Sequence, residues 1–186
     1  MSWLFGQAIH AAFVVNDIDA EIARMLAMGL GPVYVMRNIR PNARFRGDRH
    51  DPLITAAFLY SGHLQLEFLQ QHDDTPSSYR EFLERQPAGG LNHLAYYCDD
   101  FGSALARAAE AGRNYDVVQE YVWPDGTPYE IYLEPSGEDN PLLVQLIRPG
   151  VVDRLFDRMK QEAASWDGKD PIRDAMAMMA AERTRR

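Results

Sequence analysis

The sequence is poor in the residues that several common classes of protein require. Cys98 is the only cysteine among 186 residues, so an internal disulfide and a zinc site made of several thiolates are both excluded. Lysine and arginine number 19 against 27 aspartates and glutamates, and the formal net charge of −8 argues against a nucleic-acid partner. No run approaches the ~18 apolar residues of a membrane span, so we expect no membrane partner and a cytoplasmic location. The 46% hydrophobic content is typical of a domain with a sizeable core, for which a small-molecule partner is the simplest expectation.

The chain contains an internal repeat. A shift of 83 residues (93 minus 10) places the segment IHAAFVVNDIDAEIARMLAMG on NHLAYYCDDFGSALARAAEAG. His10 then matches His93, and Asp17 matches Asp100. Each copy begins with an apolar run typical of a strand and continues into a helical pattern, with the aspartate at the position of a helix N-cap. The repeat therefore predicts two related structural modules.

The pattern along each copy predicts one strand, one helix and three further strands, a βαβββ module in an α+β fold. We expect residues 1–150 to hold the paired modules, at about 8–70 and 91–148, joined by residues 71–90 with a short helix at Ser78–Arg85. The predicted strands cover residues 8–15, 32–39, 53–60 and 63–70 in the first module, and 91–98, 114–122, 128–134 and 141–148 in the second.

Residues 151–186 are expected to form a helical C-terminal extension. The pattern predicts one helix at 151–164 and a second that begins at Asp170 and Pro171, by the N-cap and first-turn preferences of these residues. Ile172, Ala175 and Met179 would share one apolar face of the second helix, together with Met176. Such a face would pack on the domain or on a second subunit.

Four polar side chains occupy matching positions in otherwise apolar strands. His10 and His93 belong to the first strand of each module, and Glu67 and Gln145 belong to the last strands, LQLEFLQ and LLVQLIR. They could be ordinary strand residues, but an unpaired carboxylate is costly to bury, and a cation would remove that cost. Two imidazoles, a carboxylate and an amide oxygen suit Zn, Fe, Mn, Co or Ni. We therefore predict one divalent metal ion held by His10, Glu67, His93 and Gln145.

The segments IHAAFVVNDIDA, LQLEFLQ, GGLNHLAYYCDD and LLVQLIR give residues 8–148 a resemblance to the vicinal oxygen chelate superfamily. That superfamily includes glyoxalase I, methylmalonyl-CoA epimerase, the extradiol dioxygenases and metal-free antibiotic-binding proteins, and the chain is most similar to the glyoxalase and epimerase branch. The resemblance implies a cupped mixed β-sheet, a homodimer and the same four metal ligands. Gln145 departs from the branch, which usually has glutamate there, so Glu67 is the only carboxylate of the set.

The resemblance implies a metal-dependent isomerase, epimerase or lyase that moves a proton next to a carbonyl group. Glu67 is then the candidate base, and Tyr97 is expected to assist. Two alternatives remain open at this point. An extradiol-type dioxygenase would use the same two histidines and carboxylate to bind iron, and a metal-free binding module would hold an aromatic or drug-like ligand.

Five arginines lie between residues 37 and 49 of this acidic chain. Guanidinium groups match carboxylates and phosphates in geometry and charge, so Arg40, Arg44 and Arg46 are candidates for binding an anionic substrate. The alternative is a solvated loop whose charges are balanced by neighbouring acids.

Overall fold

Both copies of the repeat fold into the predicted strands and helices. The computed structural model describes residues 2–137 and 142–183. The first module contains β1 (Ala8–Val14), α1 (Ile18–Ala27), β2 (Val33–Ile39), β5 (Ile54–Ser61) and β6 (Leu64–Gln71). The second contains β7 (Gly90–Tyr97), α3 (Phe101–Glu110), β8 (Tyr115–Val122), β9 (Pro128–Pro135) and β10 (Leu143–Ile147). Between them α2 (Ser78–Arg85) has the predicted bounds, whereas residue 141 of the last predicted strand and residues 184–186 lie outside the described residues.

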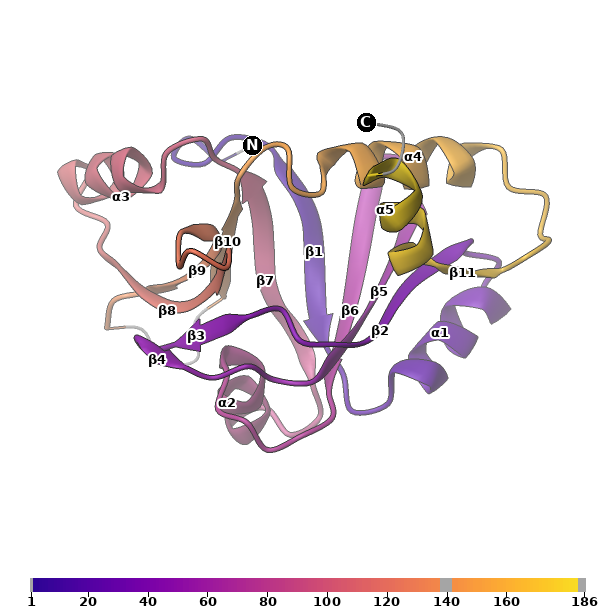
Figure 1. Cartoon of the computed structure of the whole chain (residues 1–186), viewed down its shortest axis with the longest axis horizontal. Coiled ribbons are helices and arrows are strands. Elements are labelled where there is room, and N and C mark those ends of the chain that lie inside the picture. Colours follow the sequence, from indigo (N-terminus) through magenta and orange to yellow (C-terminus); the bar gives the residue numbers. More distant parts are fainter. Residues whose placement is uncertain (1, 138–141, 184–186) are drawn as a thin grey trace.

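All described strands belong to one mixed sheet, in the order β11-β2-β5-β6-β1-β7-β10-β9-β8-β3-β4. In each module the first strand pairs in parallel with the last, β1 with β6 and β7 with β10. The modules meet where β1 and β7 pair antiparallel, side by side at the centre of Figure 1. Strand order is therefore mirrored about this junction, as expected for two related modules, and the predicted α+β class with a mixed sheet is confirmed.

Helices α1 and α3 cover the outer face of the sheet. Each begins at its predicted aspartate: the Ala20 N–H donates to Asp17 Oδ1 at 3.0 Å and the Ser103 N–H donates to Asp100 Oδ1 at 3.1 Å. The buried side of α1 packs with residues of β2, β5 and β6, and that of α3 packs with residues of β9 and β10. This leaves the inner face of both modules for a third, separate cluster of buried residues.

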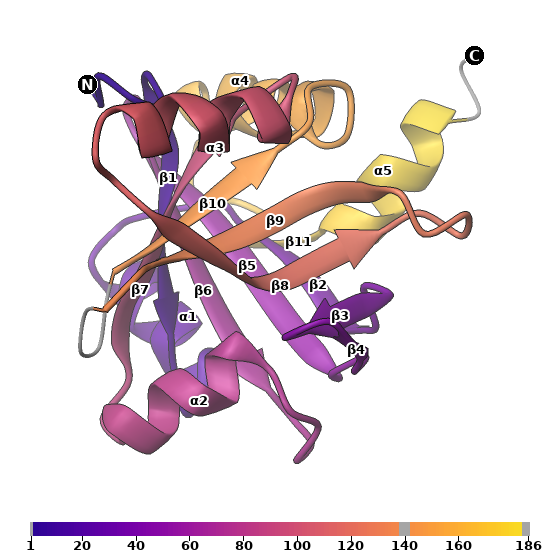
Figure 2. The same ribbon diagram turned by 90° about the vertical axis from the view of Figure 1, so that its left-hand side faces the viewer.

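The arginine-rich segment is not a free loop, because part of it forms a hairpin of β3 (Ala43–Phe45) and β4 (Asp48–Arg49). Strand β3 pairs with β8 of the second module, and Figure 2 shows the hairpin beside that strand. Only residues 40–42 connect the end of β2 to β3, a span of at most ~14 Å for an extended chain. The sheet must therefore curl until its two flanks come close, which makes the cup.

The C-terminal extension packs on the inner face of the first module through α4 (Asp153–Ala164) and α5 (Ala175–Arg183), which contact β5 and β2 respectively. Two tyrosines hold α4 against the sheet: the Tyr34 hydroxyl donates to the carbonyl of Met159 at 3.1 Å, and the Tyr60 hydroxyl donates to that of Phe156 at 3.0 Å. Among the described residues, no helix is long and apolar enough to cross a membrane.

The predicted start of the last helix at Asp170 is wrong. Ile172–Asp174 instead form β11, which pairs in parallel with β2, and the helix begins at Ala175. The open edge of β2 offers backbone hydrogen bonds that outweigh the local preference for a helical turn. Asp174 takes the capping role, because its Oδ1 accepts a hydrogen bond from the Ala177 N–H at 3.0 Å.

Gly89, just before β7, is expected to be essential for the approach of the two modules. Its φ is +75°, and a Cβ there would lie 2.5 Å from the Val14 carbonyl oxygen at the end of β1. Gly112 has φ +73°, and a Cβ there would meet nothing within 4 Å, so this glycine provides a matched control. Gly112→Ala should cost about 1–2 kcal/mol for the left-handed backbone alone, and Gly89→Ala clearly more. Urea unfolding of both variants measures this, and equal losses would contradict the close approach.

Candidate metal centre

A cavity of about 390 Å³ lies inside the cup. Its lining comes from both modules, from the segment that crosses between them and from the extension. His10, Glu67 and Gln145 are among the lining residues, and most of the others are apolar. The cavity therefore combines a small polar group of side chains with a larger apolar space, as small-molecule sites do.

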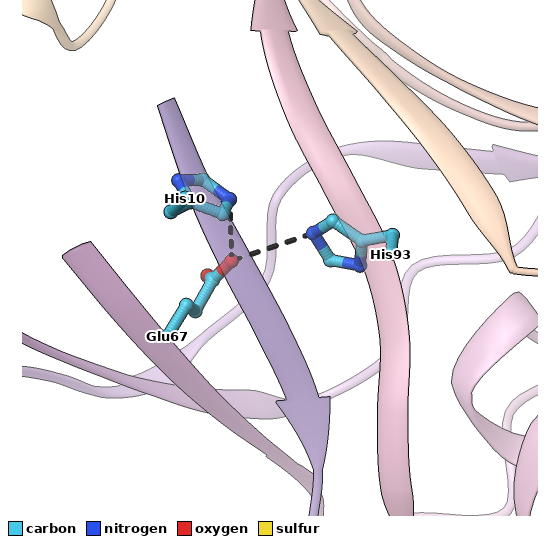
Figure 3. Close-up of side chains that lie close together, drawn as sticks. All are labelled: His10, Glu67 and His93. Carbon is cyan, nitrogen blue, oxygen red and sulfur yellow. Dashed lines mark ion pairs between the residues drawn. The ribbon is translucent and has the colours of Figure 1, made fainter. Parts of the chain in front are cut away.

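Two histidines and one glutamate converge from three neighbouring strands, β1, β6 and β7 (Figure 3). His10 and Glu67 line the cavity, and His93 lies buried beside them. Glu67 Oε2 lies 3.0 Å from His10 Nε2 and 3.5 Å from His93 Nε2. One ligand atom from each of the three residues lies within 4.8 Å of the others. All three side chains are buried, with His93 at 0% exposure.

Strand register explains why the four predicted residues come together. Ala12, two residues after His10, lies opposite Glu67, and Ala95, two residues after His93, lies opposite Gln145. Each module therefore places one oxygen ligand candidate beside its own histidine. Gln145 Oε1 lies 3.1 Å from His10 Nε2, so the fourth residue also reaches the group.

Two buried amides lie beside the Nδ1 atoms of the two histidines. His10 Nδ1 lies 3.2 Å from Gln65 Oε1, and His93 Nδ1 lies 2.9 Å from Asn92 Oδ1. An amide oxygen can only accept, so in His93 Nδ1 is the donor and Nε2 bears a lone pair. In His10 both ring nitrogens face oxygen atoms, because Nε2 also lies beside Gln145 Oε1 and Glu67 Oε2. The Nε2 atoms of both histidines lie beside the carboxylate of Glu67.

This arrangement fits a divalent cation. His93 Nε2 and Glu67 Oε2 are buried and make no hydrogen bond among the described residues. The His93 lone pair and the carboxylate and amide oxygens repel one another unless a proton or a cation lies between them. Two histidines and one carboxylate form a set that suits first-row divalent metals. The role of these residues as metal ligands is a prediction that the geometry supports.

Gln145 is held by two partners that the sequence analysis missed. Its Nε2 donates to Glu130 Oε2 at 2.9 Å and to the Tyr132 hydroxyl at 2.8 Å, which turns Oε1 toward His10. The matching residues beside Glu67 are apolar: Phe58 lies opposite Glu67 as Tyr132 lies opposite Gln145. An amide needs acceptors for its N–H groups and a carboxylate does not, so the neighbours differ with the ligand. The signal for Glu130 in the sequence is an acid within the apolar run YEIYL.

The two carboxyl groups of the cavity differ in acidity. Burial raises the pKa of Glu67, but the neighbouring His10 and His93 outweigh it and lower the pKa to about 2. Burial and the charge of Glu67 raise the pKa of Glu130 to about 8, against the hydrogen bond from Gln145. Burial also lowers the pKa of His93, although Glu67 opposes this shift. At neutral pH the site thus holds an ionised Glu67, a neutral His93 and a protonated Glu130.

Of the other predicted site residues, Arg40 lines the cavity, whereas Tyr97, Arg44 and Arg46 do not. Tyr97 does not line the cavity, and burial together with Asp153 and Asp157 raises its pKa. Arg46 pairs with Glu81 at 2.9 Å and Glu134 at 3.2 Å, and Arg44 Nη1 lies 3.9 Å from Glu120, both outside the lining. Arg40 does line the cavity, while its Nη1 lies 3.1 Å from Asp73 Oδ2.

We predict that Glu130 makes the metal-free protein less stable as pH rises. Its pKa in the folded protein, about 8, exceeds the ordinary value of 4.5, so between these values the folded state keeps a proton that the unfolded chain has lost. The free energy of unfolding therefore falls across this window. Glu130→Gln should abolish the part of this fall that Glu130 causes. The free energies of unfolding of variant and wild type should therefore shift relative to each other by about 1 kcal/mol or more, in favour of the variant, at pH 8 and by little at pH 5. Urea unfolding of the chelator-treated wild type and variant measures this. The prediction is contradicted if the free energies of unfolding of the two proteins change with pH in the same way.

Comparisons with known proteins agree with this fold. The curated ethylmalonyl-CoA/methylmalonyl-CoA epimerase of Cereibacter sphaeroides is 26% identical over 144 residues, 77% of this chain and 98% of that protein. The crystal structure of methylmalonyl-CoA epimerase from Mycobacterium tuberculosis has a TM-score of 0.52 at 17% identity, covering 81% of this chain and 92% of its own. A methylmalonyl-CoA epimerase in complex with methylmalonyl-CoA and NH4+ has a TM-score of 0.53 at 16% identity, covering 80% and 97%.

The sequence model of one superfamily matches residues 9–128, which is more than half of the chain and includes β1, β6 and β7. The match thus contains His10, Glu67 and His93, whereas β10 and the extension follow it. The chain belongs to the glyoxalase/bleomycin resistance protein/dioxygenase superfamily.

Proposed function

We propose that this protein is a metal-dependent epimerase or isomerase that transfers a proton at the carbon next to a carbonyl group of a small molecule. The observation that carries the proposal is the buried group of His10, Glu67 and His93, whose ligand atoms converge within 4.8 Å of one another beside a cavity of substrate size. The epimerase relative, matched over nearly all of its length, supports the reaction type. The lyase reaction is a less favoured form of the same proposal.

The chain's own residues would hold and orient the cofactor and the substrate. His10, His93 and Glu67 would bind one divalent cation, with the Gln145 amide oxygen as a fourth ligand. When bound, such a cation supplies a Lewis acid that stabilises negative charge on a carbonyl oxygen. Gln65, Asn92, Glu130 and Tyr132 keep the ligand side chains in orientation through the hydrogen bonds described above.

Two carboxyl groups could handle the proton. Glu67 reaches the cavity from the first module and Glu130 from the second, and they are the only acidic residues in the described lining. An epimerase must remove a proton from one side of a carbon and return one to the other side. Glu67 would accept the proton and Glu130 would return one, a division of roles that suits two carboxyl groups in different environments. Tyr97 has no part in this scheme.

Arg40 is the one predicted anion-binding residue that the scheme retains, because it alone of the three arginines lines the cavity. Arg44 and Arg46 lie outside the lining and are not used, while Arg40 lines the cavity and also pairs with Asp73. The homodimer and the cytoplasmic location stay predictions.

Protein purified without a metal-binding tag should contain close to one divalent metal ion per chain. His10→Ala/His93→Ala should remove it, since both imidazole ligands are lost. Elemental analysis measures the ratio, and His50→Ala/His63→Ala, which changes two histidines outside the cavity lining, is the matched control. Full metal content in the first double variant would place the metal elsewhere.

Glu67→Gln should slow exchange of the acidic C–H with solvent deuterium by ~10²-fold or more, as expected for a lost general base. Part of the metal should remain, because an amide oxygen can still coordinate it. Proton NMR with ethylmalonyl-CoA and methylmalonyl-CoA as first substrates gives the rate, and Glu84→Gln on the exposed side of α2 serves as control. Unchanged exchange in Glu67→Gln, or a reaction that needs ferrous iron and dioxygen, would refute the proton-transfer mechanism.

A further inference from the structure

The C-terminal extension forms one wall of the cavity. Val152 and Phe156 contribute from α4 and its start, and Met176 and Met179 contribute from α5. The Phe156 ring packs edge-on to His10, with ring centroids 6.0 Å apart, and lies 5.2 Å from the Phe58 ring. The residues of this apolar wall follow the segment that the superfamily model matches. Through Phe156, the wall lies directly beside His10, one of the proposed metal ligands.

The second module supplies an aromatic wall. Tyr121, Tyr129 and Tyr132 line the cavity, and their rings form a connected group with centroid distances of 6.3 and 5.6 Å from Tyr121. Trp123, which is 41% exposed, packs on Tyr129 at 4.4 Å. Aromatic rings at such distances favour a further ring or a branched apolar group placed among them.

The volume of the cavity exceeds the volume of the reacting part of the substrate. A cavity of about 150 Å³ holds one benzene molecule, and a carbonyl group with its acidic carbon and a carboxylate has a similar number of heavy atoms. With about 390 Å³ available, more than half of the space is left for the rest of the substrate. The polar lining consists of His10, Glu67, Glu130 and Gln145 with Arg40 and Asn42, and of four tyrosines whose hydroxyl groups are hydrogen-bonded within the protein. The remaining space is therefore largely apolar.

We propose that the substrate carries, on or beside its acidic carbon, an apolar substituent the size of a phenyl ring or larger, and that the C-terminal extension selects it. This inference rests on the proposed function for the reaction, and it adds the class of substrate. The extension then acts as a specificity element: Phe156, Met176 and Met179 contact the substituent while the two modules hold the reacting end.

Methylmalonate and benzylmalonate are the probes that test the apolar part of the cavity, which we call the chamber. They share two carboxylates and differ only in the apolar substituent. Tryptophan fluorescence of the metal-loaded protein should show benzylmalonate binding on the order of 10- to 100-fold more tightly, from the added apolar burial. Met176→Trp, at a position that is 43% exposed and so tolerant of a larger side chain, should fill the chamber and remove most of this preference. Met28→Trp, at an exposed methionine outside the lining, should keep it.

The N-acetylcysteamine monothioesters of the same two malonates test the reaction separately. In D2O, loss of the C–H signal above the protein-free blank reports replacement of the acidic proton by a solvent deuteron, and we expect faster exchange of the benzyl compound. Equal affinity for both malonates, or equal loss of both in Met176→Trp, would overturn the substrate class even if exchange occurs. Selective binding of benzylmalonate without exchange of either thioester would overturn the proposed reaction and support the chamber.

Discussion

Strands β1 and β7 pair antiparallel at the centre of the sheet, with Ala12 opposite His93. This single pairing brings the first strands of the two modules together, and each first strand carries a histidine. Because β6 and β10 flank them in parallel, Glu67 and Gln145 arrive beside the histidines from the two sides. The site exists only through this junction, since neither module alone contains more than one histidine and one oxygen ligand candidate of the set. The close approach at Gly89 lies at the same junction.

The two modules are related, but they differ in the oxygen ligand candidate and in the residues beside it, and the neighbours of each suit its hydrogen-bonding needs. The first module carries the carboxylate, Glu67, and surrounds it with apolar neighbours such as Phe58. The second carries the amide, Gln145, and adds Glu130 and Tyr132 to accept its N–H groups. Because Glu67 is the only carboxylate among the four predicted ligands, a bound divalent cation would keep a net positive charge. That residual charge suits the stabilisation of a developing oxyanion.

The C-terminal extension both packs on the sheet and lines the part of the cavity that we propose selects the substrate. It closes one side of the cup through hydrogen bonds from Tyr34 and Tyr60, and Glu162 on α4 pairs with Arg173 of β11 at 2.6 Å. The residues that pack it on the sheet are neighbours of those that line the cavity. Changes in this segment would therefore alter the shape of the cavity without replacing any of the proposed metal ligands.

The repeat, the helix caps at Asp17 and Asp100 and the strand patterns were readable from the sequence, because they depend on local periodicity and local hydrogen bonding. The equivalence of His10 with His93 and of Glu67 with Gln145 was readable for the same reason. Tertiary structure alone decided that β3 crosses to β8, that Ile172–Asp174 adds to the edge of β2 instead of starting a helix, and that Gln65, Asn92 and Glu130 orient the site. Each of these depends on a partner distant in sequence, and a backbone or side chain shows no preference for such a partner until the sheet has brought the two together.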